Sequence, residues 1–463
     1  MIFPSVQFAV FFVLVLPLSW LLMPKQSVWK PFILVASYVF YAAASWKFCF
    51  LLAAVTLVSQ LAAVGISRSE NERARRYMMI GGVAFDLGIL GVFKYYGFFS
   101  QQVSAVFNSL GVGSPVPLLQ LALPVGISFF SFQAVSYVVD VWRGRVQRAK
   151  LLDAGVYLSF FPHLVAGPIV RASEFLPQLK KPRDPRRVAV GAGITLIASG
   201  VFMKVVIADY LARALVDPVF AVPQAYGGLD VLLGAYGFAV QIYCDFAGYT
   251  NIAIGLALLL GFIFPENFNK PYRSLSVREF WTRWHMTLSR FMRDFLYIPL
   301  GGNRKGKWRT YLNLMITMML AGLWHGASWT FVLWGAWNGI GLVVNHILDG
   351  RLKMPKWLAW LLTFNFIVFG WILFRATSVT EVGELLSRLA SLGHLSLLTW
   401  QTGLAIVAVI GIQLLPLEPL ARIRLRLWHA RPVLLGAGLA FVIIVSAATV
   451  STQGVPPFIY FRF

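Results

Sequence analysis

The sequence is poor in charged residues, and those it has are unbalanced in sign. Only 13% of its 463 residues are charged, and 40 lysines and arginines stand against 18 aspartates and glutamates. With 58% hydrophobic residues, the chain has too few polar side chains to cover the core of a water-soluble protein. This composition excludes an ordinary soluble domain and predicts an integral membrane protein.

Several chemical motifs are also missing. The two cysteines, Cys49 and Cys244, lie far apart inside apolar segments, a spacing that predicts neither a disulfide framework nor a metal site. The sequence has no His-x-x-x-His or Cys-x-x-Cys pair and no Gly-x-Ser-x-Gly elbow. We therefore expect no bound metal and no serine-hydrolase nucleophile.

Long apolar runs are what the sequence has in abundance. A helix needs about 20 apolar residues to cross a hydrocarbon layer of ~30 Å. The runs predict an all-α polytopic membrane protein of about 11–12 transmembrane helices, forming one membrane-embedded domain over residues 1–463. The opening MIFPS lacks the lysine or arginine of a cleaved signal peptide, so we expect the first run to be retained as a helix. The runs occupy residues 5–23, 31–46, 48–65, 78–96, 117–139, 188–208, 229–262, 310–325, 329–347, 357–374, 399–418 and 433–452.

Lysines and arginines gather in alternate loops between these runs. With the N-terminus outside, the asymmetry places the basic loops in the cytoplasm, as the positive-inside rule requires, and puts Lys94 and Lys204 at the ends of runs. The net charge of +22 therefore indicates membrane orientation and not nucleic-acid binding. The cytoplasmic loops expected on this basis are residues 24–30, 66–77, 140–150, 171–187, 265–309, 349–356 and 419–432.

One apolar segment does not fit the alternation. LLDAGVYLSFFPHLVAGPIV, residues 151–170, has basic loops on both sides, so a full crossing would put one of them on the wrong face. Pro162 and the pair Gly167-Pro168 also deprive a helix of backbone hydrogen bonds. We predict a re-entrant segment, as found in proteins that build a pore or tunnel, in which His163 satisfies a freed backbone group.

Residues 265–309 predict a cytoplasmic amphipathic region. At helical spacing, aromatic and aliphatic side chains fall on one face, and Arg283, Arg290 and Arg293 fall on the other. We expect one interfacial helix that runs to Pro299, with His285 at the margin of its apolar stripe. The arginines could contact anionic lipid or bind a phosphate-bearing donor, and His285 could lie among headgroups or line a cavity. The apolar stripe consists of Trp281, Trp284, Leu288, Phe291 and Phe295.

The next two runs, residues 310–347, predict a helical hairpin with His325 near its turn. A histidine inside a membrane protein usually faces the bundle interior or a cavity, although it could simply hydrogen-bond across helices. We expect Ser328 and Trp329 on the same helix side, and Gly322 and Gly326 to admit a close backbone or substrate. A lone neutral imidazole is suited to act as general base for a hydroxyl that attacks an activated acyl group.

Four segments carry successive motifs: YCDFAGYTNIAIG (243–255), FPENFNKPYRS (264–274), REFWTRWHMTLSRFMRDFLYIPLGGN (278–303) and LWHGASWTFVLWGAWNG (323–339). These segments resemble the motifs of the membrane-bound O-acyltransferase family, and specifically of its bacterial alginate O-acetyltransferase branch. FPHLVAGPIVR (161–171) matches in the same order. Asp245 and Asn269 lie within these motifs, but the residues themselves suggest no definite role for either.

The resemblance implies a helical fold around a tunnel or funnel, with His325 as the catalytic histidine and His285 as the second motif histidine. It further implies that acetyl passes from a cytoplasmic donor, acetyl-coenzyme A, across the bacterial inner membrane. The acceptor would be an exported polysaccharide such as alginate, or a partner acetyltransferase on the outer face.

Two other functions stay open at this point. In the related D-alanyl transfer branch, a carrier-protein thioester is the donor and teichoic acid the acceptor. The chain could also be a transporter or lipid scaffold, although transporters usually show repeated halves with paired broken helices.

Overall fold

The computed structural model describes residues 1–449 except 2, 4, 114, 115, 118, 120, 352, 392 and 429. Every regular element in this part of the chain is a helix, which confirms the all-α prediction. The last residues of the predicted run 433–452, and the tail that follows it, lie outside the described residues.

The chain forms two compact units. Unit 1 contains residues 1–193 and 253–265, and unit 2 contains the rest, so that α10 (Val190–Val201) and α13 (Gly228–Leu259) contribute to both. The division into two compact units does not test the prediction of one membrane-embedded domain, which therefore stays a prediction. The α-helices of unit 1 are α1 (Val6–Leu22), α2 (Gln26–Ser45), α3 (Lys47–Arg68), α4 (Glu72–Leu90), α5 (Tyr96–Ser109), α6 (Ile127–Trp142), α7 (Leu151–Ser159), α8 (Phe161–Leu164) and α9 (Ala172–Lys180).

Unit 2 holds the later helices and most of the π-helical turns. Its α-helices are α11 (Asp209–Leu211), α12 (Asp217–Ala221), α14 (Val277–Arg283), α15 (Met286–Met292), α16 (Lys307–His325), α17 (Trp329–Leu348), α18 (Lys356–Arg375), α19 (Val379–Ala390), α20 (Trp400–Leu414), α21 (Leu417–Trp428) and α22 (Pro432–Thr449). The π-helical turns of the chain are η1 (Gly91–Tyr95), η3 (Phe202–Ala208), η4 (Ala212–Val216) and η7 (Arg293–Tyr297), and the 3₁₀ turns are η2 (Pro185–Arg187), η5 (Pro223–Ala225) and η6 (Pro271–Arg273).

Seven helices of the described chain are long and apolar enough to cross a membrane. Four shorter apolar helices, at Val6–Leu22, Ile127–Trp142, Trp400–Leu414 and Val433–Ser446, overlap predicted runs, although Ile127–Trp142 starts ten residues after the start of the predicted run 117–139. The protein is therefore a multi-pass membrane protein, while the sidedness of its loops stays a prediction. The seven helices are Gln26–Ser45, Lys47–Arg68, Glu72–Ser109, Val190–Ala221, Gly228–Leu259, Trp329–Leu348 and Lys356–Arg375.

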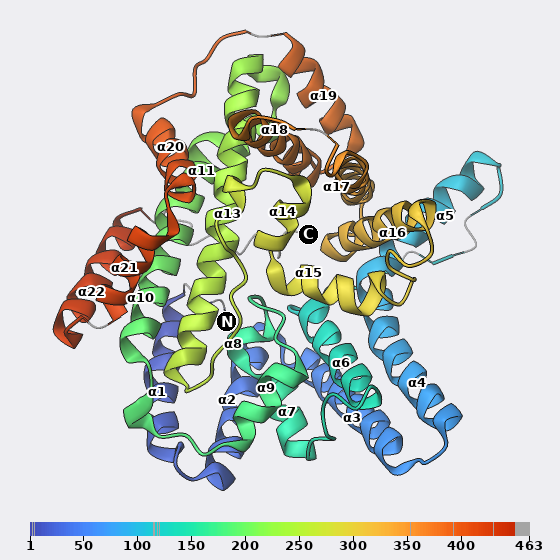
Figure 1. Ribbon diagram of the computed structural model, residues 1–463, viewed down its shortest axis with the longest axis vertical. Helices are drawn as coiled ribbons and strands as arrows, with labels where there is room; N and C mark the ends of the chain where they lie inside the picture. The colour runs from blue at the N-terminus through green and yellow to red at the C-terminus, as the bar shows by residue number, and fades with distance from the viewer. Residues whose placement is uncertain are drawn as a thin grey trace. The chain divides into compact units, whose positions relative to one another are not determined.

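Unit 1 is built around a bundle in which α3, α4 and α6 pack against one another (Figure 1). A Cβ at Gly82 of α4 would lie 2.9 Å from Ala62 and 3.3 Å from Val138, so this glycine permits the close approach of all three helices. The hydroxyl of Ser59 donates to the carboxylate of Asp86 at 3.2 Å, which satisfies a buried acidic group between α3 and α4.

The predicted break in residues 151–170 is present in unit 1. Helix α7 ends at Ser159, α8 is a single turn that begins next to Pro162, and Gly167 has a φ of +118°. Residues 153–170 are all buried within the unit, as expected for irregular backbone whose polar groups need protein partners. The re-entrant course through a membrane stays a prediction.

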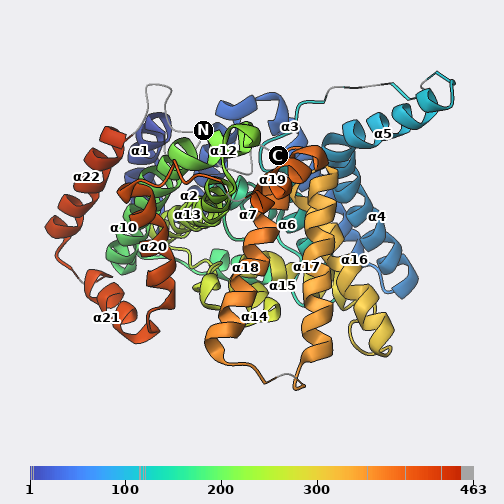
Figure 2. The ribbon, with the colours of Figure 1, turned by 90° about the horizontal axis from the view of Figure 1, so that it is seen from above.

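In unit 2, α16 and α17 form the predicted hairpin and run side by side (Figure 2). The two helix backbones nearly touch, because a Cβ at Gly322 would lie 2.1 Å from the carbonyl oxygen of Phe331. A Cβ at Gly335 would lie 2.4 Å from that of Met318. The glycines around His325 therefore serve helix packing. A Cβ at Gly326 would likewise clash with the ring of Phe331. Gly322 and Gly326 therefore make room for the partner helix and its side chain, and not for a substrate.

Candidate active site

The interfacial helix predicted within residues 265–309, and expected to run to Pro299, is interrupted, which corrects the sequence prediction. Helix α14 starts after Ser276, whose hydroxyl accepts from the N–H of Glu279, and ends at Arg283. Trp284 is extended, His285 has a left-handed φ of 41°, and α15 starts at the next residue. One continuous amphipathic helix is therefore wrong, although both short helices lie in the predicted region (Figure 1).

Backbone hydrogen bonds from an upstream segment explain the interruption. The N–H of Met286 donates to the carbonyl of Asn267 at 2.9 Å, and the N–H of Asn269 donates to the carbonyl of Arg283 at 2.9 Å. These bonds replace the helical ones that a continuous helix would make across Trp284 and His285. Histidine tolerates the left-handed region better than most residues, so the turn is possible without glycine.

His285 is fully buried, which corrects its predicted position at the margin of an interfacial stripe. Its Nδ1 lies 3.1 Å from Oδ1 of Asn267, and its ring meets the ring of Phe246 edge-on at 4.6 Å. Burial lowers the pKa of His285 to about 3, because the charged imidazolium would lose its hydration. The side chain is therefore neutral at physiological pH.

His325 is the last residue of α16 and is 3% exposed. Edge-on contacts surround its ring, with centroid distances of 4.9 Å to Trp324, 5.0 Å to Trp334 and 5.3 Å to Phe374. The helix ends here, and the hydroxyl of Ser328 instead caps α17 by accepting from the N–H of Thr330. The prediction that Ser328 and Trp329 share one helix side with His325 is therefore wrong.

The structure brings the two motif histidines to one aromatic cluster. The indole of Trp324 lies 6.1 Å from the ring of His285 and 4.9 Å from that of His325, so the imidazoles are no farther apart than the sum of these distances. Trp371 continues the cluster, with ring distances of 4.8 Å to Trp284 and 6.2 Å to Trp334. Two buried imidazoles in apolar walls can accept and return protons in a region that excludes water.

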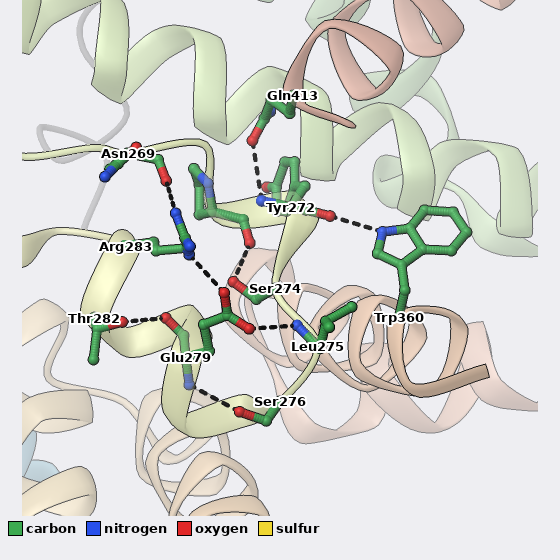
Figure 3. A network of polar contacts seen from close by, with 11 residues as sticks. Asn269, Tyr272, Ser274, Leu275, Ser276, Glu279, Thr282, Arg283, Trp360 and Gln413 are labelled. Atoms are coloured by element: carbon green, nitrogen blue, oxygen red, sulfur yellow. Dashed lines mark hydrogen bonds and ion pairs between the residues drawn. The ribbon is translucent and has the colours of Figure 1, made fainter. Parts of the chain in front are cut away.

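The predicted donor-binding arginines occupy different environments. Figure 3 shows Arg283 inside a structural network, where its Nε donates to Glu279 at 2.9 Å and its Nη1 donates to the carbonyl of Asn269 at 3.2 Å. The same carboxylate accepts from the N–H of Leu275 at 2.8 Å. Arg283 therefore stabilises α14 and the loop before it.

Arg293 is more accessible than Arg283. Its side chain is 60% exposed and its Nε donates to Asp294 at 2.7 Å, and this hydrogen bond raises its pKa. Arg290 is half-buried on α15. Binding of a phosphate-bearing donor by Arg283, Arg290 and Arg293 stays a prediction.

Asp245 belongs to a buried charge cluster that the sequence analysis did not identify. The ammonium group of Lys204 lies 2.7 Å from Asp209 and 2.8 Å from Asp245, and all three side chains are nearly fully buried. Lys204 lies inside the apolar helix Val190–Ala221, in its π-helical turn η3, and not at the end of a span as predicted. A lysine within an apolar run was the available signal, because such a charge requires partners.

Asn267 is the second residue that sequence reasoning missed. It is 1% exposed and its Oδ1 accepts hydrogen bonds beside His285. Asn269, which lies in the same motif, contributes its backbone through the bonds to Arg283 described above. Within the described ranges, no three His, Cys, Asp or Glu side chains are grouped so that they could hold a metal ion.

Comparison with known proteins identifies the family of the chain. The profile of the membrane-bound O-acyltransferase family matches residues 126–380. The chain is 37% identical to "Probable alginate O-acetylase AlgI" of Pseudomonas putida, over 93% of this chain and 94% of that protein. It is 34% identical to the peptidoglycan O-acetyltransferase of Helicobacter pylori, over 80% of this chain and 75% of that protein.

A more distant similarity links the chain to a teichoic acid D-alanyltransferase of Streptococcus thermophilus, at 34% identity over 50% of this chain and 58% of that protein. The family profile covers both histidines, the interrupted helix and the α16–α17 hairpin. The chain therefore belongs to the membrane-bound O-acyltransferase family and is a multi-pass O-acyltransferase.

Proposed function

We propose that this O-acyltransferase moves an acetyl group from a cytoplasmic thioester donor across the membrane for O-acetylation of an exported polysaccharide. Support comes from relatives that match most of both chains and are named for the O-acetylation of alginate and of peptidoglycan. Acetyl-coenzyme A is the donor we propose, because a thioester is already activated and needs no nucleophile from the protein. Family membership favours this enzyme over a transporter or lipid scaffold.

In the proposed reaction, His325 acts as the general base. Its imidazole accepts the proton of the acceptor hydroxyl while the hydroxyl oxygen attacks the carbonyl carbon of the thioester. The tetrahedral intermediate collapses when the carbon–sulfur bond breaks, and the proton on the imidazole passes to the departing thiolate. The products are an O-acetyl ester and a free thiol, and His325 returns to its neutral form.

The observation that carries this proposal is the burial of two imidazoles against the indole of Trp324. His285 is 0% and His325 is 3% exposed, and aromatic rings line both. A site of this kind supports acyl transfer, because it keeps water from hydrolysing the thioester and strengthens the hydrogen bonds made at the reacting atoms. It also keeps an imidazole neutral, as a general base must be before it accepts a proton.

The donor is proposed to approach from the basic face of the interrupted helix region. Arg293 is exposed and Arg290 is half-buried, so both can meet a phosphate group of the donor. Arg283 already bonds to Glu279 and Asn269, so we expect a smaller direct contribution from it.

The proposed location is the bacterial inner membrane, with the basic loops in the cytoplasm. In a Cys49→Ser background, a cysteine at exposed Lys305 should react with an impermeant maleimide only from the cytoplasmic side of oriented vesicles. Gly113 is exposed, and a Cβ added there would meet no other atom within 4 Å. A cysteine at Gly113 should react only from the outside. Reaction of both from the same side would contradict the proposed orientation.

D-alanyl transfer to teichoic acid is the second candidate function. The D-alanyltransferase of Streptococcus thermophilus matches only half of this chain, whereas the two O-acetylating relatives match 93% and 80% of it. This difference in coverage favours acetyl as the transferred group.

A proteoliposome assay tests the proposal directly. Purified protein is supplied with radiolabelled acetyl-coenzyme A outside inverted vesicles, and alginate, peptidoglycan fragments or a periplasmic acetyltransferase partner inside. Label in the lumenal glycan supports direct transfer, and label that appears only with the partner supports a relay. His325→Gln protein is the matched control. Label from a D-alanyl carrier-protein thioester, with none from acetyl-coenzyme A, would overturn the acetyl proposal.

A further inference from the structure

Asn267 contacts His285 through an oxygen that three donors share. Oδ1 of Asn267 lies 3.1 Å from Nδ1 of His285 and accepts from both the N–H of Thr287, at 3.1 Å, and its hydroxyl, at 2.8 Å. Its backbone carbonyl also accepts from Met286. The side chains of all three bonded residues are buried, with exposures of 1% or less. Asn267 thus holds both the ring of His285 and the left-handed turn beneath it.

These contacts determine which way the amide of Asn267 faces. A backbone N–H can only donate a hydrogen bond, so the Asn267 atom opposite the N–H of Thr287 must be its oxygen. An amide oxygen can only accept, so Nδ1 of His285 must carry a proton. In a neutral imidazole the other nitrogen then has a lone pair, which leaves Nε2 of His285 as a hydrogen-bond acceptor.

We propose that Asn267 is a positioning residue that holds His285 as the Nδ1–H tautomer, so that Nε2 accepts a hydrogen bond from an N–H or O–H of the bound acyl donor or acceptor. Within the described chain, Nε2 of His285 is buried and has no hydrogen-bond partner, and the same is true of Nδ2 of Asn267. A buried polar atom without a partner needs an explanation, and a ligand that binds beside it is one. The inference rests on the proposed acyl-transfer function for its catalytic consequence.

Sequence position alone would not assign this role. Asn267 and His285 are 18 positions apart in the sequence, with a complete helix, α14, between them, and only the return of the chain after Arg283 brings the two side chains together. Thr287 completes the arrangement, because its two donors leave the Asn267 oxygen no alternative orientation. The amide is therefore oriented before any substrate binds.

The tautomer can be measured without any substitution. Solid-state ¹⁵N NMR of protein labelled with [¹⁵N]histidine distinguishes protonated from unprotonated ring nitrogens, and subtraction of the His285→Gln spectrum assigns the His285 signals. We expect a protonated Nδ1 and an unprotonated Nε2. A His285 signal with a protonated Nε2 would overturn the proposal whatever acyl group the enzyme transfers, which separates its failure from that of the acetyl proposal.

Two substitutions then test the consequence for turnover. Asn267→Ala removes the acceptor, so we expect loss of the pure Nδ1–H signature and a decrease in kcat on the order of 10- to 100-fold, as for other groups that orient a functional histidine. KM for the acyl donor should rise together with the loss of kcat if Nε2 accepts from the donor, and should stay at the wild-type value if Nε2 accepts from the acceptor. Asn267→Asp keeps an acceptor oxygen, so it should retain the tautomer and recover part of kcat.

Asn313→Ala is the matched control. Asn313 is also a fully buried asparagine of unit 2, and its Nδ2 donates to the carbonyl of Gly302 at 2.8 Å and not to a histidine. We expect a lower melting temperature with an unchanged His285 signature and unchanged kcat. Equal losses of kcat in Asn267→Ala and Asn313→Ala, or a lost kcat in Asn267→Ala with the wild-type tautomer, would show that Asn267 serves only the fold.

Discussion

Two buried histidines lie at helix interruptions, one in each unit, and they differ in what holds them. In unit 1, Nε2 of His163 donates to the backbone carbonyl of Tyr157 at 2.8 Å. That carbonyl lies in the last turn of α7, where it would otherwise have no helical partner. In unit 2, the partner of His285 is the side chain of Asn267. His163 completes a helix end, whereas His285 is oriented by a side chain.

The comparison shows that burial alone does not identify a functional histidine. Both residues are fully buried, and aromatic rings such as Phe264, stacked on His163 at 5.2 Å, surround each of them. Each ring keeps one buried nitrogen without a hydrogen-bond partner among the described residues, so the informative feature is the partner of the other nitrogen, a backbone carbonyl for His163 and a side chain for His285. His285, by contrast, shares the indole of Trp324 with His325. The contrast between a histidine with a structural partner and the histidines proposed to take part in acyl transfer leads to the following predictions.

The largest expected effect is the loss of acyl transfer when His325, the proposed general base, is replaced. His325→Gln should lower the rate of acyl transfer by ~10²- to 10⁴-fold, because an amide can hydrogen-bond but cannot accept and return a proton. The wild-type rate should rise with pH as the imidazole of His325 loses its proton, and this rise should be absent from the pH–rate profile of His325→Gln protein. Initial rates from acetyl-coenzyme A, measured beside the melting temperature, check this prediction. Near wild-type turnover in a folded His325→Gln protein would end the general-base mechanism.

A second prediction concerns the buried ammonium group of Lys204, whose ion pairs with Asp209 and Asp245 stabilise the fold. Lys204→Met leaves Asp209 and Asp245 buried beside each other without their cation, and removal of one partner from a buried ion pair typically costs about 3–5 kcal/mol. We expect a large loss of thermal stability, measured by intrinsic fluorescence in detergent. The triple change Lys204→Met, Asp209→Asn and Asp245→Asn should recover part of it, and an equally unstable triple variant would argue against charge imbalance as the cause.

His163 provides the opposite test. His163→Leu leaves the carbonyl of Tyr157 without its donor, which should cost about 1–3 kcal/mol of stability. Turnover per folded molecule should stay at the wild-type level, because the bond serves a helix end. Melting temperature and active-site-normalised kcat are measured together. A His163→Leu protein of unchanged stability that has lost its kcat would reverse the assigned roles of His163 and His285.

The depressed pKa of His285 predicts a pH dependence of stability. The folded pKa of about 3 lies below the value of about 6.5 for an unfolded histidine. Between these values only the unfolded chain binds the proton, so stability is present above pH 6.5 and is lost as pH falls, by about 1.4 kcal/mol per pH unit. Melting temperatures between pH 7.5 and 5 should decrease less steeply in His285→Gln protein than in wild type. Parallel curves would contradict a neutral, buried His285.

The smallest expected effect concerns the arginines. Arg290→Gln with Arg293→Gln should raise the donor KM by a few fold and leave stability nearly unchanged, since exposed ion pairs contribute about 0–1 kcal/mol. Arg283→Gln should instead lower the melting temperature, because it removes the bonds to Glu279 and Asn269. Steady-state kinetics with acetyl-coenzyme A check both. A donor KM that only Arg283→Gln changes would place the donor contact in the network of Figure 3.

The sequence by itself determined the class of the protein, its apolar helices and the broken segment in unit 1. These features follow from local chemistry, because about 20 apolar residues suffice for a span and Pro162 with Gly167 interrupts a helix wherever it lies. The motif histidines were also identified from the sequence, by the family resemblance and by the rarity of a titratable group in so apolar a stretch.

Only the tertiary structure decided the interruption at His285, the partners of Lys204 and the role of Asn267. No proline or glycine marks the step from Trp284 to His285, and the helical period continues across it, so the local signal favours one helix. The hydrogen bonds that overrule this preference come from Asn267 and Asn269, on the far side of a helix in sequence. Long-range bonds between such segments leave no local pattern, because each partner is an ordinary residue until the fold brings the two together.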